Sequence, residues 1–238
     1  LRARRTTDTY RVAENAAYYG LLPESISHEG YSSHPVHAYW DDFWALAGFR
    51  AAPLLANVVG DGEHVEIYTA LRDDFEKDLL DSLPRAMAMH GIDFVPGSVE
   101  LGDFDPSSTA VVVGLVGDDP RIRPALDRTF SRYLDEVASR RHDAHDWVAY
   151  SPYELRNVEA LTLLGRRAEA HALLDWLVAD RRPPGWNEWA EISYRDRNAP
   201  QFIGDMPHTW VGSIFVHALR TMLVHERDQD HAIVIGQG

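Results

Sequence analysis

The chain lacks cysteine, and this absence excludes several kinds of chemistry. None of its 238 residues is Cys, so disulfide bonds, thiolate nucleophiles and cysteine-ligated zinc are excluded. Long apolar runs are also missing: no stretch of about 18 apolar residues occurs, so no membrane-spanning helix is expected. No glycine-rich phosphate-binding loop and no Gly-x-Ser-x-Gly nucleophile turn is present. The chemistry that remains must come from carboxylates, imidazoles and aromatic side chains.

Basic residues are few relative to acidic ones. The chain has 23 Lys and Arg against 37 Asp and Glu, which gives a formal net charge of −14. Binding to nucleic-acid phosphates needs a basic face, and the only dense basic group, Arg2, Arg4 and Arg5, is too short to supply one. Hydrophobic residues make up 45% of the chain, which is ordinary for a globular core. We therefore expect a globular protein that binds neither nucleic acid nor a membrane and needs no cofactor.

Helical periodicity dominates the sequence. The clearest case is an apolar residue at every fourth position from Ile67 to Met87, which predicts one long helix with a buried stripe. Similar patterns predict further helices over residues 8–19, 36–49, 124–139, 152–164, 167–179 and 208–225, and residues 51–59 are expected either to continue the helix over 36–49 or to form the next one. About eight helices, mostly in antiparallel pairs without a short repeat, indicate an all-α fold of the α/α-toroid type rather than a regular solenoid.

Two segments interrupt the helical pattern. Residues 92–119 are rich in Gly and Pro and include the β-branched run from Ala110 to Val116, so a long loop with a short strand is expected there. Residues 181–204 predict a second long loop, and loops of this length in compact domains are usually functional. The short apolar segment at residues 232–235 predicts a strand that pairs with something outside the chain.

The most informative motif is the sequence Val-His-Ala-Tyr-Trp-Asp-Asp-Phe-Trp at residues 36–44. Trp40 and Trp44 flank the adjacent carboxylates Asp41 and Asp42, and His37 precedes them. Burying unpaired charge is costly, so a segment built only for stability would not normally place two carboxylates between tryptophans. Aromatic rings pack on the apolar faces of sugars, and carboxylates bind hydroxyls or transfer protons. The motif therefore predicts a sugar site.

A second cluster, Trp-Asn-Glu-Trp-Ala-Glu at residues 186–191, repeats this composition. Glycoside hydrolysis commonly uses two carboxyl groups on opposite sides of the scissile bond, about 6.5–9.5 Å apart when the enzyme inverts configuration. The two clusters therefore predict two walls of one active-site cleft. Other carboxylates in suitable settings are Asp103, Asp105 and Asp205.

Several of these residues have a structural alternative. Asp105 precedes Pro106 and also fits a helix N-cap, and Asp205 fits a cap of the last helix. Trp40 and Trp44 are spaced as a core stripe would be, and the glutamates of the second cluster also fit solvated or structural roles. The histidine-rich residues 142–146 and the histidines of the loop at residues 28–37 fit polar loops better than metal sites, so no metal is expected.

Two segments carry a resemblance to a known superfamily. The sequence Tyr-Trp-Asp-Asp-Phe-Trp at residues 39–44 resembles the general-acid loop of the six-hairpin (α/α)6-barrel glycosidases, which include glucoamylases and trehalases. It is also similar to the Tyr-Trp-Asp motif of trehalases, in which the Asp binds sugar. The segment from Trp189 through Gly204-Asp205-Met206-Pro207 to Trp210 resembles the loop that carries the base glutamate before the last helix of glucoamylase-type enzymes.

The resemblance implies residue roles. Glu191 would be the base, with Glu188 as the fallback, and Asp41 would be the acid or a sugar-binding residue. Glu191 follows Asp41 by 150 residues, which is about half of such a barrel and would place the two loops across its mouth. The implied substrate-binding residues are His37, Trp40, Asp42, Trp44, Asp103, Asp105, Trp186, Glu188, Trp189, Asp205, His208 and Trp210.

The resemblance also implies an architecture and a function. Residues 1–238 would form a single catalytic domain, a partial (α/α)6 toroid with about four of its six hairpins, and its partner would be the missing N-terminal part of the same polypeptide. The expected activity is inverting hydrolysis of an oligo- or polysaccharide. Two alternatives remain open: a polysaccharide lyase or sugar epimerase of the same fold, served by Tyr31, Tyr39 and His37, and a non-catalytic carbohydrate-binding domain.

Overall fold

The computed structural model describes residue 12 and residues 15–27, 30–142, 146–183, 185–196, 204–227 and 232–238. Most of these residues are helical, which confirms the predicted all-α class. The chain divides into two compact units, residues 1–129 and 130–238, and each unit is described by itself. The toroid and the assignment of the whole chain to one catalytic domain stay predictions.

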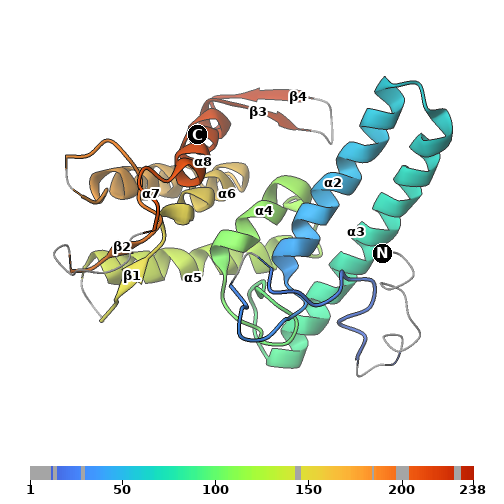
Figure 1. Ribbon diagram of the computed structural model, residues 1–238, viewed down its shortest axis with the longest axis horizontal. Coiled ribbons are helices and arrows are strands. Elements are labelled where there is room, and N and C mark those ends of the chain that lie inside the picture. The colour runs from blue at the N-terminus through green and yellow to red at the C-terminus, as the bar shows by residue number, and fades with distance from the viewer. Residues whose placement is uncertain are drawn as a thin grey trace. The chain divides into compact units, whose positions relative to one another are not determined.

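A helical hairpin forms the centre of unit 1 (Figure 1). Helix α2 (Tyr39–Val58) packs along α3 (Gly62–His90), and α4 (Pro106–Val116) packs on α2. Helix α3 begins where the side chain of Asp61 accepts the His64 N–H at 3.3 Å, and it ends at Gly91, which adopts a left-handed conformation with φ of 63°. The fully buried side chains of the hairpin are Tyr39, Phe43 and Leu46 of α2 and Phe75, Leu79, Leu80 and Leu83 of α3.

The predicted helix over residues 67–87 is confirmed, but its buried stripe covers only part of it. Burial begins at Phe75, whereas Ile67 is 44% exposed. The predicted helix over residues 36–49 continues into residues 51–59 as the single helix α2, which starts at Tyr39. The predicted helix over residues 8–19 lies largely outside the described residues, and residues 15–20 form turns.

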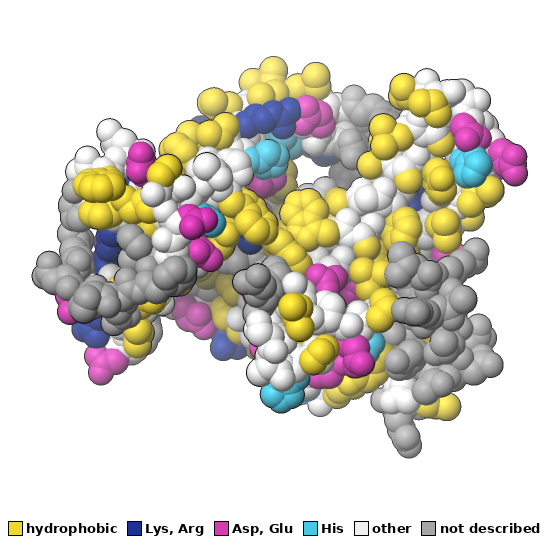
Figure 2. Space-filling view, viewed as in Figure 1, with side chains coloured by type: hydrophobic (Ala, Val, Ile, Leu, Met, Phe, Trp, Pro, Cys, Tyr) yellow, Lys and Arg dark blue, Asp and Glu magenta, His cyan; other side chains and the backbone are white. Residues whose placement is uncertain are grey.

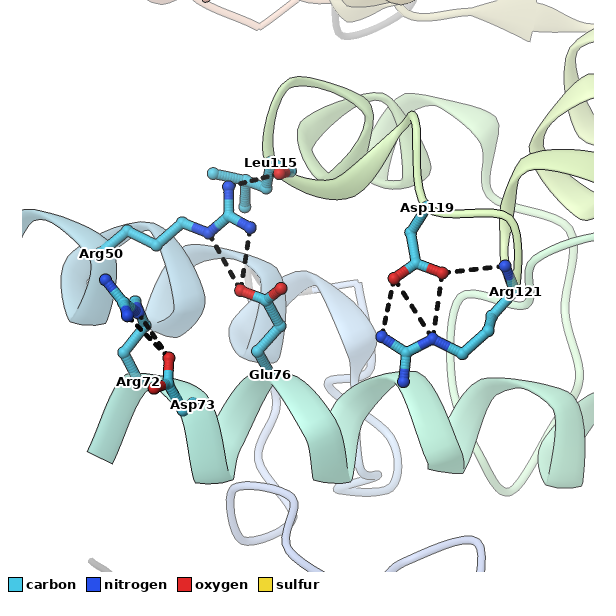
Figure 3. A network of polar contacts seen from close by, with 7 residues as sticks. All are labelled: Arg50, Arg72, Asp73, Glu76, Leu115, Asp119 and Arg121. Carbon is cyan, nitrogen blue, oxygen red and sulfur yellow. Dashed lines mark hydrogen bonds and ion pairs between the residues drawn. The ribbon is translucent and has the colours of Figure 1, made fainter. Parts of the chain in front are cut away.

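Arg50 of α2 connects three helices of unit 1 (Figure 3). Its Nε and Nη2 atoms lie 3.1 and 2.8 Å from Oε2 of Glu76 on α3, and its Nη1 donates to the backbone carbonyl of Leu115 on α4. In the turn after α4, Arg121 binds the carboxylate of Asp119 and lowers the pKa of that carboxyl. The contacts of Arg50 fix α4 against the hairpin.

The strand expected within residues 110–116 is wrong, because this segment forms α4. Two local signals override the strand preference of its valines. Asp105 accepts the Ser108 N–H at 3.0 Å as the N-cap, and Pro106 occupies the first turn. Packing on α2 then buries Val112, Val113 and Val116, so a β-branched run is tolerated in a helix.

Apolar side chains reach the surface where α2 passes into α3. Leu54, Leu55, Val58 and Val59 are 65–81% exposed. Hydrophobic and charged side chains alternate at this end of the hairpin (Figure 2). The hairpin is therefore well buried near the start of α2 and apolar at its surface near the turn.

Unit 2 is built from helices with two small antiparallel ladders. It contains the C-terminal part of α5 (Arg123–Arg141), and α6 packs against both α7 and α8. Its other elements are β1 (Ala149–Tyr150), the 3-10 helix η3 (Pro152–Glu154), α6 (Leu155–Leu163), α7 (Arg167–Ala179), β2 (Ser193–Tyr194), α8 (Thr209–Leu223), β3 (Val224–Arg227) and β4 (Ala232–Ile235). Strand β1 pairs with β2, and β3 pairs with β4.

The predicted strand at residues 232–235 is confirmed, but its predicted partner is wrong. It pairs with β3 inside the chain, with His225 opposite Val234. Helix α8 ends at Leu223 because Val224 adopts an extended conformation with φ of −158°. Within the described part of the chain, no helix is both long and apolar enough to cross a membrane.

Candidate functional site

The carboxylates of unit 1 are engaged by protein hydrogen-bond donors. Asp41 accepts hydroxyl hydrogen bonds from Ser25 at 2.5 Å and from Ser27 at 2.8 Å. Asp42 is 1% exposed and accepts the Leu22 N–H at 2.9 Å. The first turn of α2 therefore uses both carboxylates to hold the chain segment that precedes it.

The loop before α4 uses its carboxylates in the same way. Asp103 accepts hydrogen bonds from Tyr31 and Ser98, each at 2.7 Å. Burial and the adjacent Asp103 carboxylate raise the pKa of Tyr31, so its phenol stays protonated and donates. Asp105 caps α4 and accepts from Ser108.

His37 and Glu100 form a close pair beside this loop. The Nδ1 atom of His37 lies 2.6 Å from Glu100 Oε1, and the His37 backbone N–H donates to Oε2 at 2.9 Å. Burial alone would raise the pKa of Glu100, but the hydrogen bonds from His37 outweigh it and lower that pKa. All five predicted residues of this region thus lie in one unit, and their hydrogen bonds fix backbone segments around the start of α2: His37, Asp41, Asp42, Asp103 and Asp105.

The two tryptophans of the first motif differ in exposure. Trp40 is 7% exposed and Trp44 is 51% exposed, and their rings meet edge to face with centroids 5.6 Å apart. Trp40 therefore belongs to the core, as the alternative interpretation had it, and Trp44 offers a ring face to solvent. Sugar binding by either residue stays a prediction.

The carboxylate of Glu191 in unit 2 differs from those of unit 1 in its hydrogen bonding. The β1–β2 ladder brings Ser151 beside it, and the Ser151 hydroxyl donates to the Glu191 backbone carbonyl at 2.8 Å. The side-chain carboxylate is half-buried, and no described residue forms a hydrogen bond or ion pair with it. It packs directly over Gly204, where φ is +70° and any Cβ atom would overlap it. This carboxylate is therefore held in place by packing, and its oxygens have no hydrogen-bond partner among the residues that the structure describes.

Tyr153, in the 3-10 helix η3 that precedes α6, lies at the centre of the surrounding residues. The Tyr153 hydroxyl is 2.6 Å from Nε2 of His208, and the ring centroids of Tyr153 and Trp210 are 5.3 Å apart in an edge-to-face contact. The guanidinium carbon of Arg156 lies 4.8 Å from the Tyr153 ring centroid and 5.5 Å from that of Trp210. We call Tyr153, Arg156, Glu191, His208 and Trp210 the Glu191 cluster.

Electrostatics connect Tyr153 with the carboxylates near it. Burial raises the pKa of Tyr153, and the negative charge of Glu191 raises it further. The positive charge of Arg156 lowers this pKa, and Asp205 raises it by a smaller amount. Both carboxylates therefore lie close enough to act on the phenol. The His208 backbone N–H donates to the Trp189 carbonyl at 2.7 Å, which ties the Glu191 segment to the start of α8.

The remaining predicted residues of unit 2 differ in exposure. Trp189 is 8% exposed and packs on Phe215, whereas Trp186 is 56% exposed. Glu188 is half-buried and Asp205 is exposed. The alternative role of Asp205 as a helix cap is wrong, because His208 occupies the N-cap of α8 and makes no side-chain cap.

Sequence reasoning did not identify Tyr153 or Arg156 as site residues. The available signal was local: Ser151 and Pro152 mark a helix start, and residues three apart on a helix share a face. The signal that gives Tyr153 a partner is not local, because His208 follows it by 55 residues.

The described residues include no group of three or more His, Asp and Glu side chains that could hold a metal ion. Of the histidine-rich segments, residues 28 and 143–145 lie outside the described part. A depression of about 400 Å³ near the β1–β2 ladder is lined by Trp147, Val148, Tyr194, Arg195 and Asp196, none of which was a predicted site residue.

Asp41 and Glu191 belong to different units. Their pairing across one cleft therefore stays a prediction. Comparisons of the chain with protein-family models, curated proteins and solved structures found no match.

Substituting Gly204 should disturb Glu191 directly. An alanine there meets the Glu191 carboxylate and also requires an L-residue at a positive φ, a conformation that costs roughly 1–2 kcal/mol. Gly165 is the matched control, since its φ is +78° and a Cβ there would meet nothing within 4 Å. We expect Gly204→Ala to lower the free energy of unfolding in urea more than Gly165→Ala does, because only the alanine at position 204 overlaps Glu191. Only Gly204→Ala should shift the carboxyl resonance of Glu191 by NMR, and equal shifts in both variants would contradict the assigned packing.

Proposed function

We propose that the chain is a glycoside hydrolase that acts on an oligo- or polysaccharide, with Glu191 as the catalytic base. The observation that carries this proposal is the uncommitted carboxylate of Glu191. A base that activates water needs free acceptor atoms. The engaged carboxylates around α2 offer fewer of them, whereas neither oxygen of Glu191 has a partner among the described residues.

The side chains around Glu191 support a sugar ligand. Trp210 is 49% exposed, so part of its ring is accessible for stacking against a sugar. His208 and Arg156 add polar groups to the same cluster. A sugar site combines an apolar platform with a few fixed polar groups in this way.

The proposed reaction inverts configuration. In that mechanism the base deprotonates a water, which attacks the anomeric carbon while an acid protonates the leaving oxygen. We propose a partial (α/α)6 toroid as the fold. In support, helices that follow each other in the sequence pack as pairs, α2 with α3 and α6 with α7.

A lyase or epimerase is the second candidate, and one observation favours it. Tyr153 and His208 lie 2.6 Å apart, and tyrosine and histidine are common acid and base groups in proton abstraction. The residues that the sequence predicts for a lyase or epimerase, Tyr31, Tyr39 and His37, fit this role less well. Tyr39 is fully buried against Ser82, and Tyr31 and His37 are bound to carboxylates.

A panel of neutral and acidic oligosaccharides tests the proposal. The chain is incubated with each glycan, the configuration of the first product is read by proton NMR, and unsaturated products are read by ultraviolet absorbance. New reducing ends of inverted configuration support hydrolysis, and an unsaturated product supports a lyase instead. Calorimetric binding without turnover supports a non-catalytic domain, and the absence of both binding and turnover contradicts a carbohydrate function.

A further inference from the structure

The two ring nitrogens of His208 have different surroundings. Nε2 lies 2.6 Å from the Tyr153 hydroxyl oxygen, a distance typical of a strong hydrogen bond. Nδ1 makes no hydrogen bond with any residue in the described part of the chain. The backbone of His208 is fixed separately by its N–H bond to the Trp189 carbonyl at 2.7 Å. The phenol is therefore the group that decides how the imidazole is oriented and protonated.

The direction of this hydrogen bond follows from its length and from the protonated state of Tyr153. Burial and the charge of Glu191 raise the pKa of the phenol, so it stays protonated near neutral pH. The 2.6 Å between the Tyr153 hydroxyl oxygen and Nε2 is shorter than the distances of about 2.7–3.2 Å that are usual for a ring N–H donor, and it fits an O–H donor, so the phenol donates the hydrogen bond to Nε2. Nε2 is then the acceptor, and the imidazole proton resides on Nδ1.

We propose that Tyr153 is a positioning residue that holds His208 in the Nδ1–H tautomer, so that His208 presents one N–H donor to an oxygen acceptor of a bound sugar. The tautomer follows from the Tyr153–His208 contact alone, and the sugar as acceptor rests on the proposed function. In this state Nε2 is occupied and Nδ1 is protonated, so the ring has no free lone pair for a metal ion. The inference thus assigns His208 to hydroxyl or carbonyl recognition and excludes it as a metal ligand.

The tautomer can be read directly by NMR in the complete chain. Two-bond proton–nitrogen correlations of ¹⁵N-labelled imidazoles are recorded at about pH 8.5, above the ordinary histidine pKa of about 6.5. His208→Gln assigns the signals. In the wild type we expect the pattern of the Nδ1–H tautomer, and in Tyr153→Phe a shift towards the Nε2–H tautomer that free histidine prefers.

Tyr153→Phe keeps the ring that contacts Trp210 and Arg156 and removes only the hydroxyl. Tyr150→Phe is the matched control, because Tyr150 donates to Asp180 at 2.8 Å elsewhere in unit 2. The control should leave the His208 signals unchanged. An Nε2–H pattern in the wild type, or the same tautomer in wild type and Tyr153→Phe, would overturn the proposal.

A kinetic measurement separates positioning from general damage. With a glycan that the enzyme turns over, Tyr153→Phe should raise KM about tenfold and change kcat less than about threefold, because the hydroxyl orients a binding group. Loss of kcat with unchanged KM would overturn a binding role for His208. The NMR result does not depend on turnover, so the expected tautomer with no active glycan would reject the proposed function and leave the positioning role standing.

Discussion

Replacing Glu191 by glutamine should lower the rate of glycan hydrolysis by about 100-fold or more, the range expected when a general base is removed. The amide has almost the shape of the carboxylate but cannot take a proton from water. No described residue forms a hydrogen bond or ion pair with that carboxylate, so the substitution removes no stabilising polar contact. The check is kcat on the best glycan, measured together with the midpoint of thermal unfolding, which should stay almost unchanged.

Two further variants make this experiment decisive. Glu188→Gln changes the same residue type three positions earlier, and near-wild-type turnover is expected for it. If Glu188→Gln loses activity and Glu191→Gln keeps it, the catalytic base is Glu188 and not Glu191. Asp41→Asn tests the predicted acid, and near-wild-type turnover in both Asp41→Asn and Glu191→Gln would refute the acid and base assignments.

Glu154→Gln should lower the free energy of unfolding of unit 2 by about 3–5 kcal/mol, the cost of breaking a buried ion pair from one side. The Glu154 oxygens lie 2.8 and 2.6 Å from Nη1 and Nη2 of Arg140, and the side chains of Glu154 and Arg140 are 13% and 11% exposed. The Tyr133 hydroxyl also donates to Glu154 at 2.6 Å. Loss of the carboxylate would leave a buried guanidinium with no compensating charge.

Glu136→Gln is the control for this loss of stability. Glu136 pairs with Arg132 one turn away on the same helix, and the two side chains are 51% and 49% exposed. Exposed pairs of this kind contribute about 0.3–0.5 kcal/mol, so its unfolding curve in urea should hardly move. Comparable shifts for Glu154→Gln and Glu136→Gln would mean that the Arg140 pair is not effectively buried.

Local signals made most of the helices predictable. The four-residue spacing from Ile67 to Met87 predicts the middle of α3. The helix extends beyond this spacing at both ends, from its N-cap at Asp61 to Gly91. Helix α4 was not predicted, because a run of β-branched residues favours a strand when burial is unknown. Its N-cap at Asp105 was recognised as an alternative, but the packing of its valines on α2 depends on contacts distant in the sequence.

The site was predictable in composition but not in detail. Aromatic and acidic motifs pointed to both segments, yet they could not separate carboxylates that accept protein hydrogen bonds from one that does not. Asp103 is bound by Tyr31, which precedes it by 72 residues, and only the fold brings such groups together. Tyr153 likewise gains its partner only through the fold, because His208 follows it by 55 residues.

The two-residue ladder between β1 and β2 has a consequence for the entropy of unit 2. By pairing Ala149 with Tyr194 it closes a loop of about 45 residues, and the loop-closure entropy of that length costs about 3 kcal/mol at room temperature. Two pairs of residues contribute too little to offset this cost. The packing of α6 against α7 and α8 must therefore supply the stability that keeps Tyr153 beside Glu191. Substitutions in that helical core would thus weaken the site without touching it.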